Sequence, residues 1–358
     1  MGHKFFSIQY LRGLAAILVL ASHALLYPLV EHNLGFSRLG WLGVILFFVI
    51  SGFIMVVVTG EGRFSAAEFL RRRFIRVVPM YWIATLLAAA LALYAPQIFK
   101  TTVYDGTQLV LSLLFIPFYN PVSGGIHPLY KLGWTLNYEM FFYVSFALLA
   151  FLGAGARVVC LTIAFSALAL MGPVFEPQSA IPQFYTSYMP LAFCAGAWVG
   201  LATMRGKISQ LSRNAIYAAA IVGLIAMIEG FAWGAETVED GYAFIGFLIF
   251  ATALVLLLVR LEPVMPRIAL FERIGDASYS IYLVHIYEVA ILSGIAFKLL
   301  DPADMFADYL VAAVSIIGGT TAGWMLYQWG ELPLLRFVSK RFASRNKPPA
   351  GPVTPAAA

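Results

Sequence analysis

Apolar stretches of about 20 residues, the length that crosses the hydrocarbon core of a bilayer, recur along the whole chain. Only 11% of the 358 residues are charged, whereas soluble domains carry roughly 25%. A water-soluble fold of this size would lack the polar side chains to cover its core. The sequence therefore predicts an all-α polytopic membrane protein. We expect about ten transmembrane helices, at 8–30, 41–59, 77–95, 133–153, 158–173, 185–203, 214–233, 242–260, 277–299 and 309–328.

The Lys and Arg residues predict the orientation of these helices. Cytoplasmic loops carry an excess of both residue types. With ten crossings and both termini in the cytoplasm, nearly all of the 23 Lys and Arg residues fall on the cytoplasmic side. Those that fall outside are Arg38, Lys100, Lys131 and Lys298. The net charge of +5 is thus explained by topology, and we expect no nucleic-acid partner.

The short apolar segment 109–118 is interpreted as re-entrant or interfacial. A crossing there would place every later cluster of cations on the wrong side. We expect one membrane domain over 1–345 and a disordered cytoplasmic tail over 346–358, which is rich in Pro and Ala. Two cysteines, Cys160 and Cys194, are too few for a zinc site, and we expect no metal.

Ionisable residues inside transmembrane helices are costly and mark functional sites. Arg12 and His23 lie eleven residues apart in the first span, which places both on one helix face about 16 Å apart along the axis. An anionic ligand held at Arg12 could reach His23 with its other end. The alternative is that Arg12 extends to lipid headgroups and His23 is a hydrogen-bonded core residue.

Glu139 is the second candidate. It is expected about two turns from the outer end of its helix, the same depth as His23. A carboxylate bonded to one imidazole nitrogen raises the basicity of the other, so we predict that Glu139 orients His23. The alternative is a Glu paired with a structural cation.

Arg73 and Arg76 are neighbours on a helix surface, three residues apart. Arginine side chains bind phosphate with two hydrogen bonds, but such a cluster is also typical of topology signals and lipid binding. Pro79 is expected in the first turn of the helix that follows. His285 could line a channel for the donor or make a structural hydrogen bond, and Glu331 is interpreted as an anchor for a basic partner.

Together these residues resemble the membrane-bound acyltransferase-3 family, which is known for O-acetylating polysaccharides and related glycans. The resemblance spans 6–340, and the opening is most similar to the subgroup that modifies bacterial exopolysaccharides. It rests on Leu11-Arg12 with His23, Gly43 to Phe53, Arg73 with Arg76, Trp134-Thr-Leu-Asn-Tyr-Glu139, and Tyr279-Ser-Ile-Tyr-Leu-Val-His285. The chain departs from the family at Ile45, where many members carry an acidic residue, and at Thr135, which replaces a serine.

The resemblance implies an O-acetyltransferase of the bacterial inner membrane. Acetyl-CoA would be a co-substrate, with no permanently bound cofactor, and a saccharide or lipid-linked glycan would be the acceptor. We expect Arg12, Arg73 and Arg76 to hold the CoA phosphates, and His23, oriented by Glu139, to act as general base. Membrane lipids are the remaining partner, and the oligomeric state, a homo-oligomer included, is left open. The competing hypothesis is a secondary transporter or flippase for a glycan or lipid, because buried His, Glu and Arg also serve proton relays.

Overall fold

The computed structural model describes residues 5–29, 37–95, 103–232, 241–300 and 305–344. Over these ranges the chain is helical, with one isolated β-bridge between Tyr119 and Ile126. The predicted tail 346–358 lies outside them. The α-helices are α1 (Phe6–Leu29), α2 (Ser37–Thr59), α3 (Ala66–Tyr94), α4 (Gly106–Leu113), α5 (Trp134–Leu148), α6 (Ala154–Phe175), α7 (Ala180–Tyr185), α8 (Pro190–Met204), α9 (Arg213–Ala232), α10 (Gly241–Leu261), α11 (Ala269–Leu299), α12 (Met305–Leu326) and α13 (Leu332–Ser344).

The polytopic membrane fold is confirmed. Eight helical segments within the described residues are long and apolar enough to cross a membrane. The 15-residue α5 is not among them. The short helix α4 has eight residues, or about 12 Å of helix, and therefore cannot cross. The number of ten crossings and the cytoplasmic termini stay predictions.

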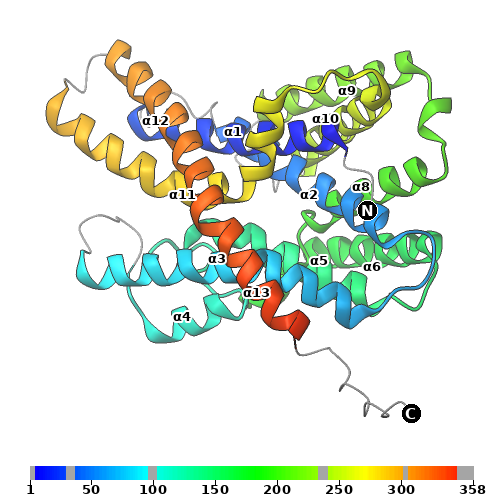
Figure 1. Cartoon of the computed structure of the whole chain (residues 1–358), viewed down its shortest axis with the longest axis horizontal. Coiled ribbons are helices and arrows are strands. Elements are labelled where there is room, and N and C mark those ends of the chain that lie inside the picture. The colour runs from blue at the N-terminus through cyan, green and yellow to red at the C-terminus, as the bar shows by residue number, and fades with distance from the viewer. Residues whose placement is uncertain (1–4, 30–36, 96–102, 233–240, 301–304, 345–358) are drawn as a thin grey trace, which may run out of the picture.

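Figure 1 shows how the long helices are arranged. Helix α1 packs against α2, α11 and α12, while α3 lies on the other side of the molecule beside α4 and α5. Helices α1, α3 and α11 all begin toward the same end of the bundle, which we call the Phe6 end and which corresponds to the predicted cytoplasmic side. At this end the Glu262 carboxylate accepts hydrogen bonds from the backbone N–H groups of Phe6 and Ser7, both 2.8 Å long.

Two helices begin earlier than hydropathy predicted. Helix α3 starts at Ala66 instead of residue 77, and α11 at Ala269 instead of residue 277. Ser65 caps α3 by accepting a hydrogen bond from the backbone N–H of Glu68. The arginine-rich turns that follow are therefore helical, because long unbranched side chains favour helix whether or not they are apolar. Pro79 lies inside α3, and its predicted place in a first turn was wrong.

Close backbone packing fixes α2 against α8. A Cβ atom on Gly52 would lie 1.9 Å from the carbonyl oxygen of Phe193, and one on Gly196 would lie 1.8 Å from that of Val49. At these two positions only glycine allows the helix backbones to approach so closely. Small residues at helix interfaces are common in membrane proteins for this reason. The contact holds α2 in place against α8.

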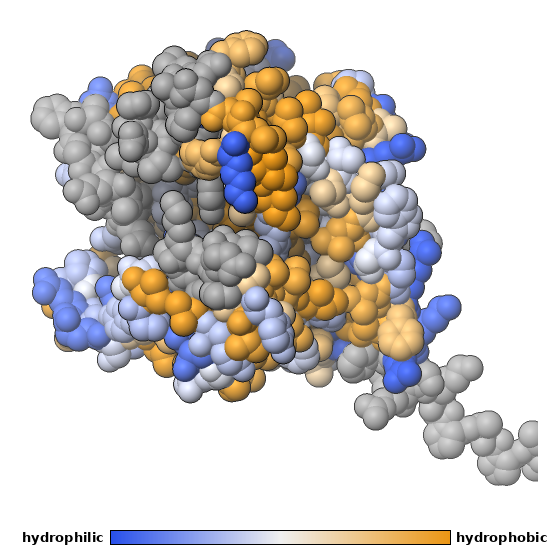
Figure 2. Space-filling view, turned by 90° about the vertical axis from the view of Figure 1, so that its left-hand side faces the viewer, coloured by the Kyte–Doolittle hydropathy of each residue, from blue (hydrophilic) through white to orange (hydrophobic). Residues whose placement is uncertain are grey.

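The surface suits a lipid environment. Figure 2, seen from the end opposite the Phe6 end, shows apolar side chains interspersed with polar ones at that end. The sides of the bundle are more uniformly apolar. On α6, Ile163, Leu170 and Val174 are 65%, 67% and 71% exposed. Such side chains on a soluble protein would form an unusually large apolar patch. In a membrane they face lipid.

Candidate active site

A cavity of about 190 Å³ lies between α1, α2, α3, α5 and α11. Its charged side chains are Arg12, Arg73, Arg76 and Glu139, which come from three helices. The sequence analysis selected all four, and the fold brings them to one place. A larger, more open cavity of about 770 Å³ beside Phe6, Arg260 and Arg267 is lined by none of the predicted site residues.

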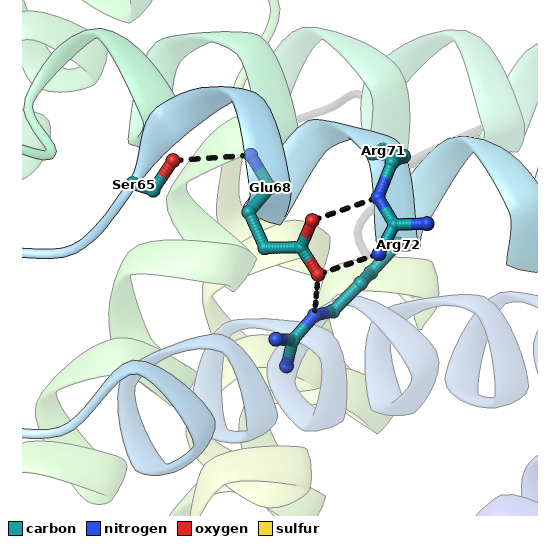
Figure 3. A network of polar contacts seen from close by, with 4 residues as sticks. All are labelled: Ser65, Glu68, Arg71 and Arg72. Carbon is teal, nitrogen blue, oxygen red and sulfur yellow. Dashed lines mark hydrogen bonds and ion pairs between the residues drawn. The ribbon is translucent and has the colours of Figure 1, made fainter. Parts of the chain in front are cut away.

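The run of arginines at the start of α3 divides into two pairs. Figure 3 shows that Glu68 binds Arg71 and Arg72, with hydrogen bonds of 2.7 Å. Both cations are therefore paired with a carboxylate of their own helix. Arg73 and Arg76, three residues apart, line the cavity instead, because residues three apart share one face of a helix.

Arg76 forms an ion pair with Glu331, which is fully buried. The other carboxylate oxygen of Glu331 accepts a 2.6 Å hydrogen bond from Ser280 on α11. Glu331 ends a π-helical segment, Tyr327–Glu331, that joins α12 to α13. The prediction that Glu331 anchors a basic partner is confirmed, and that partner is Arg76 of α3.

Arg12 and Arg73 make no ion pair within the part of the chain that the structure describes. Arg12 interacts electrostatically with the like charge of Arg76 and with the opposite charges of Glu331, Asp276 and Glu139. The Nε atom of Arg73 is buried and has no hydrogen-bond partner among the described residues. The cavity thus holds two guanidinium groups that are not neutralised by direct contact with a carboxylate, as an anion site requires.

Glu139 does not orient His23, contrary to our prediction. Among the described residues its carboxylate accepts hydrogen bonds from Ser51, at 3.3 Å, and from Tyr143. The prediction was wrong about depth, because it placed the start of α5 at the outer surface. The residues around that start are buried, among them Leu129, Tyr130 and Leu132.

Counting along the helices gives the difference in depth. The Leu148 end of α5 lies toward the Phe6 end, because Arg157 bonds both Leu149 and the last residue of α2, and α2 contacts Phe5 nearby. At 1.5 Å per residue, Glu139 is about 14 Å from that end of α5, whereas His23 is about 26 Å from Phe6. Glu139 therefore lies nearer the Phe6 end, at the level of Ser51 and the arginines.

His23 contacts His285 instead. The two ring centroids are 5.1 Å apart, and His285 is completely buried. Nδ1 of His23 lies 2.9 Å from the carbonyl oxygen of Val19, and Nδ1 of His285 lies 3.2 Å from that of Ile281. Because a carbonyl oxygen only accepts hydrogen bonds, each Nδ1 carries a proton, and in the neutral ring each Nε2 then keeps a lone pair.

Neither histidine lines the cavity that holds the arginines. The sequence left His285 either in a donor channel, nearer the cytoplasm than His23, or in a structural hydrogen bond. The structure shows the hydrogen bond, to the carbonyl oxygen of Ile281, and the depth expected for the channel was wrong. Helix α11 begins eight residues earlier than predicted, so His285 lies about 24 Å from its start, close to the depth of His23. His285 forms part of the histidine pair and not of the arginine-lined space.

The sequence analysis assigned no role to four residues that shape the site. Ser51 and Tyr143 hold Glu139, and Tyr279 and Tyr282 line the cavity from α11. A signal existed for Tyr143, which follows Glu139 by one helical turn, and for Tyr282, which precedes His285 by three residues.

Comparisons with known proteins agree with this picture. A family model described as "Acyltransferase domain" matches residues 5–329. The chain is 34% identical to the exopolysaccharide production protein ExoZ of Rhizobium meliloti (strain 1021), over 83% of this chain and 90% of that protein. It is 24% identical to the acyltransferase MdmB of Streptomyces mycarofaciens, over 94% of this chain and 92% of that protein. No solved structure matches.

The matched region includes every candidate residue except Glu331. These comparisons favour the enzyme over the transporter or flippase. They show that this multi-pass membrane protein belongs to the acyltransferase-3 family and is an acyltransferase.

Proposed function

We propose that this acyltransferase moves an acetyl group from cytoplasmic acetyl-CoA to a hydroxyl group of an exopolysaccharide or another cell-surface glycan, at the bacterial inner membrane. The acceptor class is supported by similarity to a protein named for exopolysaccharide production. The single observation that carries the donor assignment is the pair of unneutralised guanidinium groups, Arg12 and Arg73, in one cavity.

Anionic phosphates suit this cavity. Arg12 and Arg73 would bind the CoA phosphates through charge-assisted hydrogen bonds. Arg76 already has a carboxylate partner, so its main contribution is to fix α3 and to add positive potential. A donor bound here would carry its charge near the Phe6 end and extend its pantetheine arm toward the other side.

Glu139 lies along the path of that arm. Its carboxylate faces the cavity while Ser51 and Tyr143 hold it in place. An ionised carboxylate accepts hydrogen bonds only, and the amide N–H groups of the pantetheine arm are suitable donors. We assign Glu139 to the positioning of the donor, in place of the orientation of His23.

His23 is assigned as the general base. Its Nε2 takes the proton of the acceptor hydroxyl, the hydroxyl oxygen attacks the thioester carbonyl carbon, and the carbon–sulfur bond breaks. The departing thiolate then recovers the proton from His23, so no net proton is consumed. The hydrogen bond from Nδ1 to Val19 supports this role, because it leaves Nε2 free to accept.

The proposal is tested with purified protein in lipid nanodiscs, given acetyl-CoA and deacetylated exopolysaccharide fragments. We expect free thiol and glycan-bound acetyl ester in equal amounts, measured by a thiol reagent and by mass spectrometry. The His23→Ala variant should produce neither, and Ser22→Ala, its neighbour on α1, serves as the matched control. Release of neither product by the wild-type protein would refute the proposal.

A further inference from the structure

Two aromatic rings form one wall of the arginine-lined cavity. Phe47 of α2 and Tyr282 of α11 both line it, and their ring centroids are 6.0 Å apart with the planes at 75°. This edge-to-face arrangement is a favourable one for aromatic pairs. The two rings close the cavity between α2 and α11.

The histidine pair lies behind this wall. Tyr282 contacts His285 at 5.8 Å between centroids, and His285 contacts His23 at 5.1 Å. Phe47 also packs against the small apolar cluster that contains Leu20 and Ala24, which flank His23 on α1. Neither histidine borders the cavity. The two rings therefore lie between the arginine-lined cavity and the histidine pair, on the route from a donor held by the arginines to His23.

The two rings are held differently. The hydroxyl group of Tyr282 is tied to the start of α5, 2.8 Å from Oγ1 of Thr135 and 2.9 Å from the carbonyl oxygen of Leu132. Phe47 has no polar group and is only partly buried. A rotation of Phe47 breaks packing contacts alone, whereas a rotation of Tyr282 also breaks two buried hydrogen bonds. Tyr282 is thus the fixed side and Phe47 the movable one.

We propose that Phe47 and Tyr282 form an aromatic gate between the donor cavity and His23, and that Phe47 limits the length of the acyl group that passes. The proposal rests on the proposed function, because it assumes an acyl thioester in the cavity. An acetyl group needs a small displacement of Phe47. Each further methylene group must share the same gap with the ring, and one methylene in a tight apolar pocket changes selectivity by about 10-fold or more.

The test measures acyl-chain selectivity. Wild type and Phe47→Ala are assayed in nanodiscs with acetyl-CoA, propionyl-CoA and butyryl-CoA, and kcat/KM is measured from thiol release in the presence of the glycan acceptor. We expect Phe47→Ala to raise the butyryl to acetyl ratio of kcat/KM by about 10-fold or more. Ile54→Ala is the matched control, because Ile54 lines the same cavity from α2 and is likewise partly buried, but is not among the apolar residues that pack against the Leu20–Ala24 cluster. It should leave the ratio unchanged.

The outcomes are separable. If wild type consumes acetyl-CoA and Phe47→Ala keeps the wild-type ratio, the gate is refuted while the proposed function stands. The same holds if Ile54→Ala changes the ratio as much as Phe47→Ala does. A wild-type protein that consumes no acyl-CoA refutes both. Phe47→Leu, which removes the ring and keeps an apolar side chain, provides the same test should Phe47→Ala fail to fold.

Discussion

The two cavity-lining arginines of α3 should respond differently to the same substitution. Glu331 is fully buried, and Arg76 is its partner of opposite charge. The Arg76→Ala variant would leave that carboxylate buried with the Ser280 hydroxyl as its one remaining hydrogen-bond partner among the described residues. The Arg73→Ala variant removes a side chain that no described carboxylate pairs with. We therefore expect Arg76→Ala to lower stability and Arg73→Ala to lower donor affinity.

The magnitude follows from the burial of the pair. Removing one partner of a buried ion pair costs about 3–5 kcal/mol. The side chain of Arg76 is 30% exposed, so solvent screens part of the interaction, and we expect a loss of about 2–3 kcal/mol. Such a loss lowers the melting temperature by on the order of 5 °C. For Arg73→Ala we expect a change in stability within about 0.5 kcal/mol.

The assay follows thermal unfolding in detergent with a dye that reacts with thiols. Cys194 is buried and reports unfolding, whereas Cys160 is exposed and is replaced by serine to lower the background. A double variant, Arg76→Leu with Glu331→Leu, should recover most of the lost stability, because an apolar pair of similar size often replaces a buried ion pair without cost. Equal melting temperatures for Arg73→Ala and Arg76→Ala would contradict this reasoning. A double variant less stable than both Arg76→Leu and Glu331→Leu would also show that Arg76 and Glu331 are not coupled as described.

Four further results are expected. His23→Ala should abolish acyl transfer in a protein that melts as wild type does; measurable transfer would remove His23 from the mechanism. Arg73→Ala should raise the KM for acetyl-CoA roughly 10- to 100-fold, the range for a lost hydrogen bond to a charged group, and steady-state kinetics with an unchanged KM would return Arg73 to lipid binding. Arg157→Leu should cost about 2–4 kcal/mol in thermal unfolding, because the fully buried Arg157 donates to the carbonyl oxygens of Gly62 and Leu152 at 2.9 and 2.7 Å. Burial, and next the positive charge of Lys131, lowers the pKa of His127, despite an opposing hydrogen bond to the Pro128 carbonyl. The contribution of neutral His127 to the stability of the 119–130 loop should thus be fully present above pH 6.5, the ordinary pKa of histidine, and should decrease as the pH falls below that value. Hydrogen exchange of the loop amides, corrected for intrinsic rates, should show this pH dependence, and the His127→Asn variant should lack it.

The positions of most membrane helices along the chain could be predicted from the sequence. Long apolar runs predicted α1, α2, α6 and α10 to within a few residues, because the cost of placing polar groups in lipid is a local property of each segment. Helix boundaries outside the lipid were less predictable. The arginine-rich start of α3 is helical although it is not apolar, and hydropathy alone does not report helix propensity.

The composition of the arginine-lined cavity was also predictable in part. Arg73 and Arg76 share a helix face because of their spacing, and Arg12 and Glu139 were selected as ionisable residues inside apolar spans before the family resemblance added to the case. Spacing within one helix determines which side chains point the same way. Spacing gives no information on which residues of neighbouring helices face those side chains.

Only the tertiary structure decided the partners. Arg76 meets Glu331 across 255 residues of chain, and His23 contacts His285 where we expected Glu139. Both outcomes depend on how deep each helix sits and how it is rotated against a neighbour that is distant in sequence. Those two quantities follow from side-chain packing over the whole bundle, such as the close approach of Gly52 to α8, and no local pattern of residues encodes them.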